Sequence, residues 1–168
     1  DQTKAGEELS ETVKRPFVRT WSVSELVHQL ASFDRSGDPK RGQSMYIQAL
    51  CHRCHRHGQI GVAIGPDLTI VSSRFSQRDI IESILHPSRV VAEDYRSDQI
   101  TTSDGRVVTG QVVAHGHYRS PTLRIATDPL RPSDIIEIKK KDIVEHKKTD
   151  QSRMPDGLLN ALTADEIL

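Results

Sequence analysis

The sequence contains few aromatic residues and only two cysteines. Aromatic residues make up 4% of its 168 positions, and hydrophobic residues make up 35%. Ordinary globular domains are roughly 45–50% apolar, although that figure also counts glycine. Because apolar side chains are few, we expect something other than side chains to fill part of the core. Two cysteines three positions apart cannot form a disulfide framework, so their spacing must have a more local meaning.

An excess of charge of either sign is also lacking, since 23 Lys and Arg balance 23 Asp and Glu. A neutral chain is not drawn to a phosphate backbone or an anionic membrane, so we expect no nucleic-acid partner. There is no run of about 18 apolar residues, which predicts no membrane span in this chain. No signal-type stretch is present, and the first residue is Asp1 rather than Met. We therefore expect a processed protein or a fragment of a longer one.

Three segments have the signals of helices. The starts are a capping box at Ser22 and Glu25, an N-cap followed by proline at Asp38 and Pro39, and a cap at Ser76 and Asp79. These signals predict helices over residues 23–31, from 39 towards 51, and from 76 until Pro87 ends the third. Thr163 and Glu166 form another capping box, yet the sequence stops at residue 168. We expect the native domain to continue beyond it.

From Val90 onward the pattern becomes that of β-strands. Asp104 and Gly105 give a strong hairpin signal between two β-rich runs, and three short strands are predicted over residues 122–127, 134–138 and 142–146. This pattern indicates a small antiparallel sheet or barrel inserted into a helical protein. The predicted organisation is a tail or linker over residues 1–20, a helical domain over 21–90 and 150–168, and a β-rich insertion over 91–149. Glycine and proline make residues 58–69 a predicted loop.

The two cysteines belong to the stretch Cys51-His52-Arg53-Cys54-His55. This is C-x-x-C-H, the haem-attachment pattern. Two thiols one helical turn apart can each add across a haem vinyl group, and the histidine beside the second thiol then lies under the iron. We expect His52 to point to solvent and His57 to take no part in the chemistry.

Other interpretations of the two cysteines remain open. They could supply half of a tetrahedral zinc site, which His115 and His117 could complete from one face of a strand. They could form a redox dithiol, although such sites open a helix after a strand, and here a helix precedes the motif. They could also be buried thiols in a chance pattern.

The chain resembles class I c-type cytochromes in three stretches, GQSMYIQALCHRCH, IGPDLT and SRMPDG. With the β-rich segment, residues 22–168 more closely resemble the haem-binding domain of planctomycete and verrucomicrobial type. The resemblance implies a mainly α cytochrome c fold with an inserted small antiparallel β-sheet or barrel, α+β overall. It implies haem c, with its iron, held by Cys51 and Cys54, and it makes His55 the proximal ligand.

Further roles are implied by the same resemblance. The carbonyl of Pro66 would accept a hydrogen bond from the second nitrogen of His55, which orients the ring. Gly42 and Tyr46 match the place where the first and last helices of the family cross. Tyr46 precedes Cys51 by five positions, where the family commonly has four, so we expect the helix to bulge or to end early.

The resemblance makes Met154 the sixth ligand of the iron. Its neighbours are polar and it belongs to no apolar stripe, so its burial requires a partner outside the local sequence. Ligation by histidine and methionine leaves no open site on the iron, which favours electron transfer over oxygen or peroxide chemistry.

The sequence thus predicts a monohaem electron-transfer domain rather than an enzyme. We expect it to belong to a larger redox protein, with a redox partner protein or an upstream dehydrogenase domain, in a periplasmic or otherwise extracytoplasmic location. The alternatives are a haem enzyme or gas sensor with an open iron site, and a zinc-binding interaction module.

Overall fold

The structure is a computed structural model, and it describes residues 15–32, 37–113 and 120–168. The chain divides into two compact units. Unit 1 comprises the residues up to His86 together with Asp156–Leu168, and unit 2 comprises Pro87–Pro155. Most of the predicted tail, together with His115 and His117, lies outside the described residues.

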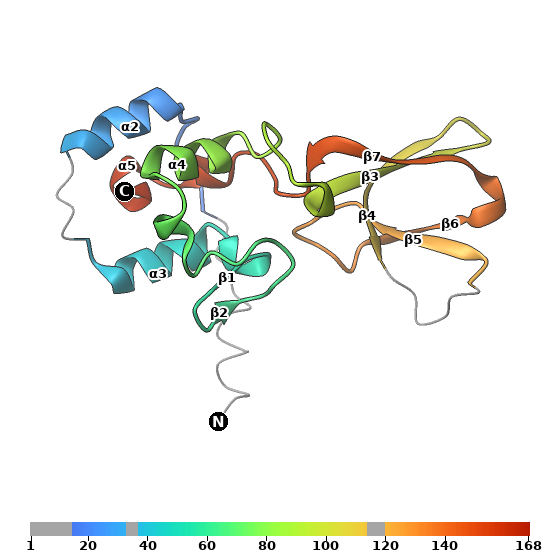
Figure 1. Ribbon diagram of the computed structural model, residues 1–168, viewed down its shortest axis with the longest axis horizontal. Helices are drawn as coiled ribbons and strands as arrows, with labels where there is room; N and C mark the ends of the chain where they lie inside the picture. The colour runs from blue at the N-terminus through green and yellow to red at the C-terminus, as the bar shows by residue number, and fades with distance from the viewer. Residues whose placement is uncertain (1–14, 33–36, 114–119) are drawn as a thin grey trace. The chain divides into compact units, whose positions relative to one another are not determined.

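Unit 1 contains the helices of the described chain (Figure 1). Its α-helices are α2 (Val23–Ser32), α3 (Pro39–Gln48), α4 (Gln77–Leu85) and α5 (Ala164–Ile167). Three short 3₁₀ turns, η1 (Cys51–Arg53), η2 (Val71–Ser73) and η5 (Leu158–Ala161), connect them with a two-stranded ribbon of β1 (Arg56–His57) and β2 (Ile60–Gly61). Of this ribbon, only β2 lies within residues 58–69, the stretch that is predicted to be a loop.

Side-chain caps fix where these helices begin, as the sequence predicts. Ser22 and Glu25 exchange hydrogen bonds at the start of α2. The Asp38 carboxylate accepts from two backbone N–H groups at the start of α3, and Ser76 forms a capping box with Asp79 before α4. A further capping box, between Thr163 and Glu166, precedes α5. Each cap satisfies N–H groups that have no partner within the helix.

The core of unit 1 joins residues from both ends of the chain. It is built from Trp21, Leu26, Ala49, Ile81, Leu159 and Leu162. The indole nitrogen of Trp21 donates to the carbonyl of Leu162 over 3.1 Å. Arg15 donates to both carboxylate oxygens of Glu166 over 2.7 and 2.9 Å. The segment that precedes α2 is therefore fastened to the segment that precedes and forms α5.

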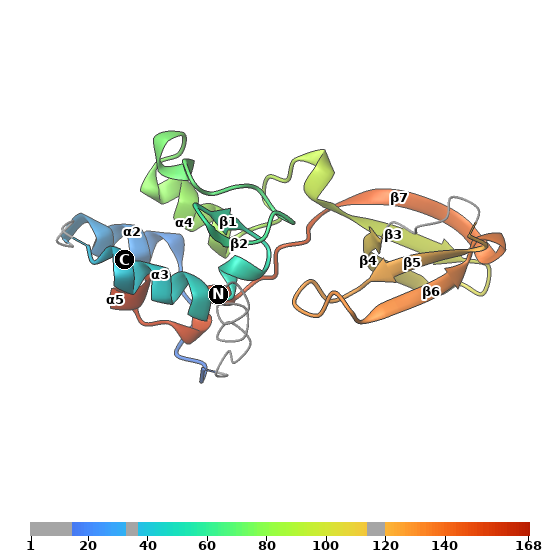
Figure 2. The ribbon, with the colours of Figure 1, turned by 90° about the horizontal axis from the view of Figure 1, so that it is seen from below.

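Unit 2 is a single five-stranded antiparallel sheet. A 3₁₀ turn, η3 (Glu93–Tyr95), leads into β3 (Arg96–Thr102), followed by β4 (Val107–Val113), β5 (Thr122–Ala126), β6 (Ile135–Lys139), the turn η4 (Lys140–Asp142) and β7 (Ile143–Ser152). The strands lie in the order β6-β5-β4-β3-β7, as Figure 2 shows. The predicted hairpin joins β3 to β4, with Gly105 at a φ of 82°. β7 extends six residues past its predicted end, because it pairs with β3 as far as Arg96 opposite Ser152.

The sheet encloses its own core and one buried carboxylate. Ile100, Val108, Ile125 and Ile138 form the apolar cluster. Beside it, the Asp98 carboxylate accepts from the ring Nε2 of His146 over 2.9 Å and from Nζ of Lys148 over 3.1 Å. It also accepts from the N–H of Val112, over 3.3 Å. β4 pairs with β3 only as far as Gly110, so Asp98 bonds β4 just beyond the point where the two strands separate.

The expectation of a mainly α fold is wrong. The described residues form four α-helices of no more than ten residues, beside a five-stranded and a two-stranded sheet. Two physical reasons account for the difference. The helix that leads to the cysteine motif ends at Gln48, and β7 continues to Ser152 where the local pattern predicted an end at residue 146. None of the described helices is both long enough and apolar enough to cross a bilayer.

Replacing Asp98 by alanine should destabilise unit 2 by about 1–3 kcal/mol, because the N–H of Val112 loses its acceptor. Hydrogen exchange of the β3 and β4 amides in the full chain measures this loss, and Asp98→Asn is the matched control because it keeps an acceptor.

Burial alone would raise the pKa of Asp98, but bonds from His146, Lys148 and Val112 lower it below the ordinary 3.8. The charged form is therefore stabilising above about pH 3.8, and its contribution is lost as the pH falls through the folded pKa.

After correction for the intrinsic exchange rate at each pH, the wild type should accordingly lose protection as the pH falls through the folded pKa of Asp98, and Asp98→Ala should not show this part of the loss. Equal exchange rates in the two proteins at neutral pH would contradict this role of Asp98.

Candidate functional site

The cysteine motif begins directly after α3 has ended. The helix stops at Gln48, and Leu50 takes a left-handed conformation with a φ of 65° before the turn η1. Left-handed backbone is uncommon for a leucine, because its Cβ crowds the adjacent carbonyl. The extra position between Tyr46 and Cys51 is accommodated here, so the expectation that the helix ends early is confirmed.

The C-x-x-C-H motif folds into one tight turn. The N–H groups of Cys54 and His55 both donate to the carbonyl of Cys51, over 3.1 and 2.9 Å. Neither cysteine is in a disulfide bond, and both are half-buried. Burial raises the pKa of Cys51 to about 11, so it stays protonated at neutral pH. A redox dithiol needs a lowered thiol pKa, so this environment disfavours that alternative.

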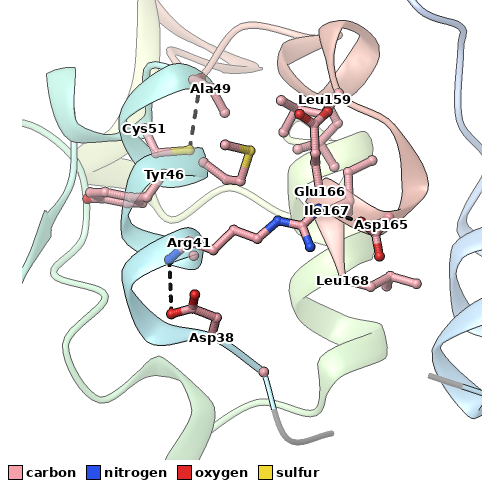
Figure 3. A pocket seen from close by; sticks show the side chains of 14 residues that line it. Asp38, Arg41, Tyr46, Ala49, Cys51, Leu159, Asp165, Glu166, Ile167 and Leu168 are labelled. Carbon is pink, nitrogen blue, oxygen red and sulfur yellow. Dashed lines mark hydrogen bonds and ion pairs between the residues drawn. The ribbon is translucent and has the colours of Figure 1, made fainter. Parts of the chain in front are cut away.

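Cys51 lines a pocket of unit 1 (Figure 3). The pocket has a volume of about 270 Å³ and lies between α3 and the segment from η5 to α5. Ala49 and Cys51 face Leu159 across it, and Arg41 and Asp165 form an ion pair at its rim. One thiol of the motif is therefore directed towards a largely apolar space.

The geometry at His55 determines which of its nitrogens is free. Its Nδ1 lies 2.8 Å from the carbonyl oxygen of Pro66. A carbonyl only accepts hydrogen bonds, so Nδ1 carries a proton, and in the neutral ring the lone pair is therefore on Nε2. The structure thus brings His55 and Pro66 together, as the resemblance to c-type cytochromes implies. An Nε2 in this state is a suitable nitrogen ligand for a metal.

Tyr46 contacts the backbone of His55. Its hydroxyl donates to the carbonyl of His55 over 2.6 Å. Burial raises the pKa of Tyr46 to about 12, so the hydroxyl keeps the proton that it donates. The sequence placed Tyr46 at a crossing of helices, and nothing in the local pattern predicted that it would bond to His55.

Two glycines allow the chain to pass close to His55. A Cβ on Gly65 would lie 2.7 Å from Cε1 of the His55 ring, and one on Gly61 would lie 2.0 Å from the His55 carbonyl oxygen. Gly61 also has a φ of 88°. Neither position can hold a side chain without displacing His55 or the chain that passes over it.

One expectation about a neighbouring residue is wrong. His52 does not point to solvent, because only 7% of it is exposed, and its Nδ1 has no hydrogen-bond partner in the described part of the chain. The turn η1 directs its side chain inward, and burial lowers the pKa of His52. At Gly42 a Cβ would meet nothing within 4 Å, so among the described residues no backbone approaches closely there. His57 is exposed, with its ring 6.2 Å from that of Tyr46.

Met154 belongs to unit 2, while the cysteine motif belongs to unit 1. It is half-buried directly after β7, and its N–H donates to the hydroxyl of Ser152 over 3.1 Å. Its role as a ligand therefore stays a prediction from the sequence. Across residues 15–32, 37–113 and 120–168, no cluster of three His, Cys, Asp or Glu side chains could hold a metal ion.

No protein-family model matches this chain. No curated protein sequence matches it either. The interpretation of the site therefore depends on the residues and their geometry.

Gly65→Ala should displace Pro66 from His55 and destabilise unit 1 by about 1–3 kcal/mol, because the new methyl group overlaps the ring. The ¹⁵N chemical shifts of the His55 ring report the outcome, since a fixed Nδ1–H tautomer should become a mixture. Gly42→Ala is the control: with open space around it in α3, it should stabilise the helix by about 0.5–1 kcal/mol. An unchanged His55 tautomer in Gly65→Ala would contradict the proposed packing.

Proposed function

We propose that this chain is a monohaem c-type cytochrome domain that transfers single electrons. The observation that carries the proposal is the hydrogen bond from Nδ1 of His55 to the carbonyl of Pro66, next to two cysteines of the same turn that form no disulfide. It leaves Nε2 available to a metal and makes that nitrogen more basic. Cys51 and Cys54 would hold the haem covalently, and His55 would bind its iron. When bound, the haem would supply an iron that alternates between the ferrous and ferric states.

The residues around the motif suit a flat apolar group. Four large apolar side chains are exposed in the segment that follows it, with exposed fractions of 46% for Val62, 43% for Ile64, 62% for Ile70 and 51% for Phe75. Exposed apolar side chains mark a binding surface where they form one patch, and a haem bound at the motif would give these four side chains an apolar group to cover them. This segment also carries Pro66, and the chain is otherwise poor in apolar residues.

The proposal includes a location and a partner. Covalent haem attachment takes place outside the bacterial cytoplasm, as the resemblance to c-type cytochromes implies, so a periplasmic or otherwise extracytoplasmic location follows. A redox partner protein, or a dehydrogenase domain of the same larger protein, would exchange electrons with the haem. The chain itself would not be an enzyme.

Expression of the full chain with a haem-attachment system should give a reduced absorption spectrum with c-type bands. His55→Ala should lose the low-spin spectrum because the iron loses its nitrogen ligand, whereas the matched change His57→Ala should keep it. A purified wild type with one zinc and no iron would contradict the proposal and support the zinc-binding alternative.

The two methionines of the chain allow a matched test of the second ligand. Met154→Leu should convert the ferric iron from low to high spin, because leucine keeps the volume but has no sulfur to bind the iron. Met45→Leu, in α3, should leave the spin state unchanged. A wild type that is already high spin and binds carbon monoxide rapidly would contradict ligation by Met154 and would favour a haem enzyme or gas sensor.

A further inference from the structure

The chain returns alongside the cysteine motif and is bonded to it at successive positions. We call residues 62–69 the return loop. The N–H of Val62 donates to the carbonyl of His52 over 3.1 Å, and the N–H of Gly65 donates to that of Cys54 over 2.6 Å. Further along, Pro66 accepts from the ring of His55. The return loop therefore follows the motif, with its residues numbered ten or eleven higher than their partners.

The bonding continues beyond Pro66 and centres on Asp67. One carboxylate oxygen of Asp67 accepts from Nε and Nη2 of Arg56, over 2.8 and 2.6 Å. Its other oxygen accepts from the N–H and the hydroxyl of Thr69, over 2.8 and 2.5 Å. The Thr69 hydroxyl in turn accepts from the N–H of Gly58 over 2.9 Å. Four donors thus converge on one carboxylate beside the His55 and Pro66 pair.

This arrangement is stronger than an ordinary surface ion pair. The side chains of Arg56 and Asp67 are 53% and 39% exposed, and an isolated pair at that exposure contributes little. Here the guanidinium uses two nitrogens, and the opposite oxygen is held by Thr69, so the carboxylate has one orientation. The hydroxyl and N–H of Thr69 and the guanidinium of Arg56 hold the pKa of Asp67 well below its usual range. It stays charged throughout the neutral range.

The positions of these two residues give the pair its significance. Arg56 is the next residue after His55, and Asp67 is the next residue after Pro66. The N–H of Leu68 also donates to the carbonyl of Arg56, over 2.8 Å. The bonds between Arg56 and Asp67 therefore fix the distance between His55 and Pro66, which are themselves joined by a single hydrogen bond.

We propose that Arg56 and Asp67 form a positioning clasp that holds the Pro66 carbonyl on Nδ1 of His55 and thereby lowers the reduction potential of the iron bound by His55. The effect on the potential rests on the proposed function. A bond from Nδ1–H to a carbonyl gives the imidazole anionic character and makes Nε2 a more basic ligand. A more basic ligand stabilises ferric over ferrous iron. Opening the clasp should therefore favour the ferrous state.

Arg56→Ala separates this effect from simple electrostatics. Removing a positive charge near the iron would by itself stabilise ferric iron and lower the potential. The clasp predicts the opposite: loss of the bond to Pro66 should shift the equilibrium towards ferrous iron about tenfold, which corresponds to about 59 mV for a one-electron couple. Asp67→Ala should shift it in the same direction. The double variant should add little to either, because the two residues act as one unit.

The experiment is a redox titration of the haem-loaded full chain, combined with NMR measurement of solvent exchange at the His55 Nδ1–H. Arg131→Ala is the control, since it removes one guanidinium from another exposed Arg–Asp pair, that of Arg131 and Asp128 in unit 2. It should leave the Nδ1–H exchange unchanged. If Arg56→Ala does not fold, Thr69→Val loosens Asp67 without a change of charge and should shift the potential in the same direction by a smaller factor.

A lower or unchanged potential in Arg56→Ala, with unchanged Nδ1–H exchange, would overturn the clasp even if stability falls, because a merely structural role predicts that pattern. A wild type that takes up no haem would instead overturn the proposed function and the effect on the potential. Exchange at Nδ1–H in the haem-free chain would then still decide whether Arg56 and Asp67 position His55.

Discussion

The hydrogen bond between Nδ1 of His55 and the carbonyl of Pro66 is the constraint on which the geometry of the site depends. It fixes the tautomer, and with it the nitrogen that is open to a metal. The bond requires the return loop to approach the ring, which is possible because Gly65 has no side chain. It also requires the backbone of His55 to stay in place. The Tyr46 hydroxyl, which comes from the helix before the motif, holds that backbone through its bond to the His55 carbonyl. A rigid, oriented imidazole suits electron transfer, because little has to rearrange when the charge on a bound iron changes.

The rest of unit 1 gives this short site a stable support. α3 ends before the cysteines, so the motif is held mainly by turns, and turns alone have little stability. The support comes from the core that Trp21, Leu26 and Leu162 share, and from the bonds of Arg15 to Glu166. Unit 2 has a separate apolar core within its sheet, and the buried Asp98 carboxylate bonds β3 to β4 beside it. Each unit therefore contains the contacts that stabilise it.

Local signals in the sequence predicted the local structure well. The capping boxes at Ser22 and Ser76 and the hairpin at Gly105 depend on neighbouring residues, and the structure confirms them. The pair of His55 and Pro66 was found through a resemblance, because no periodicity links positions so far apart. The mainly α fold was wrong, since the extent of β7 depends on its pairing with β3, which is distant in sequence. The burial of His52 and the clasp of Asp67 likewise depend on how the return loop packs. The turn in which Asp67 accepts from Thr69 has one local sign in the sequence, an Asp placed two residues before a Thr.

The central claim is that the thiols of Cys51 and Cys54 hold a haem whose iron binds His55. The most direct measurement is the mass of the full chain after denaturation and removal of free haem, followed by the mass of the proteolytic peptide that contains both cysteines. The account predicts that one haem mass stays on the chain and that it maps to this peptide. A chain of unmodified mass, purified from a host that attaches haem to other proteins, would contradict the claim.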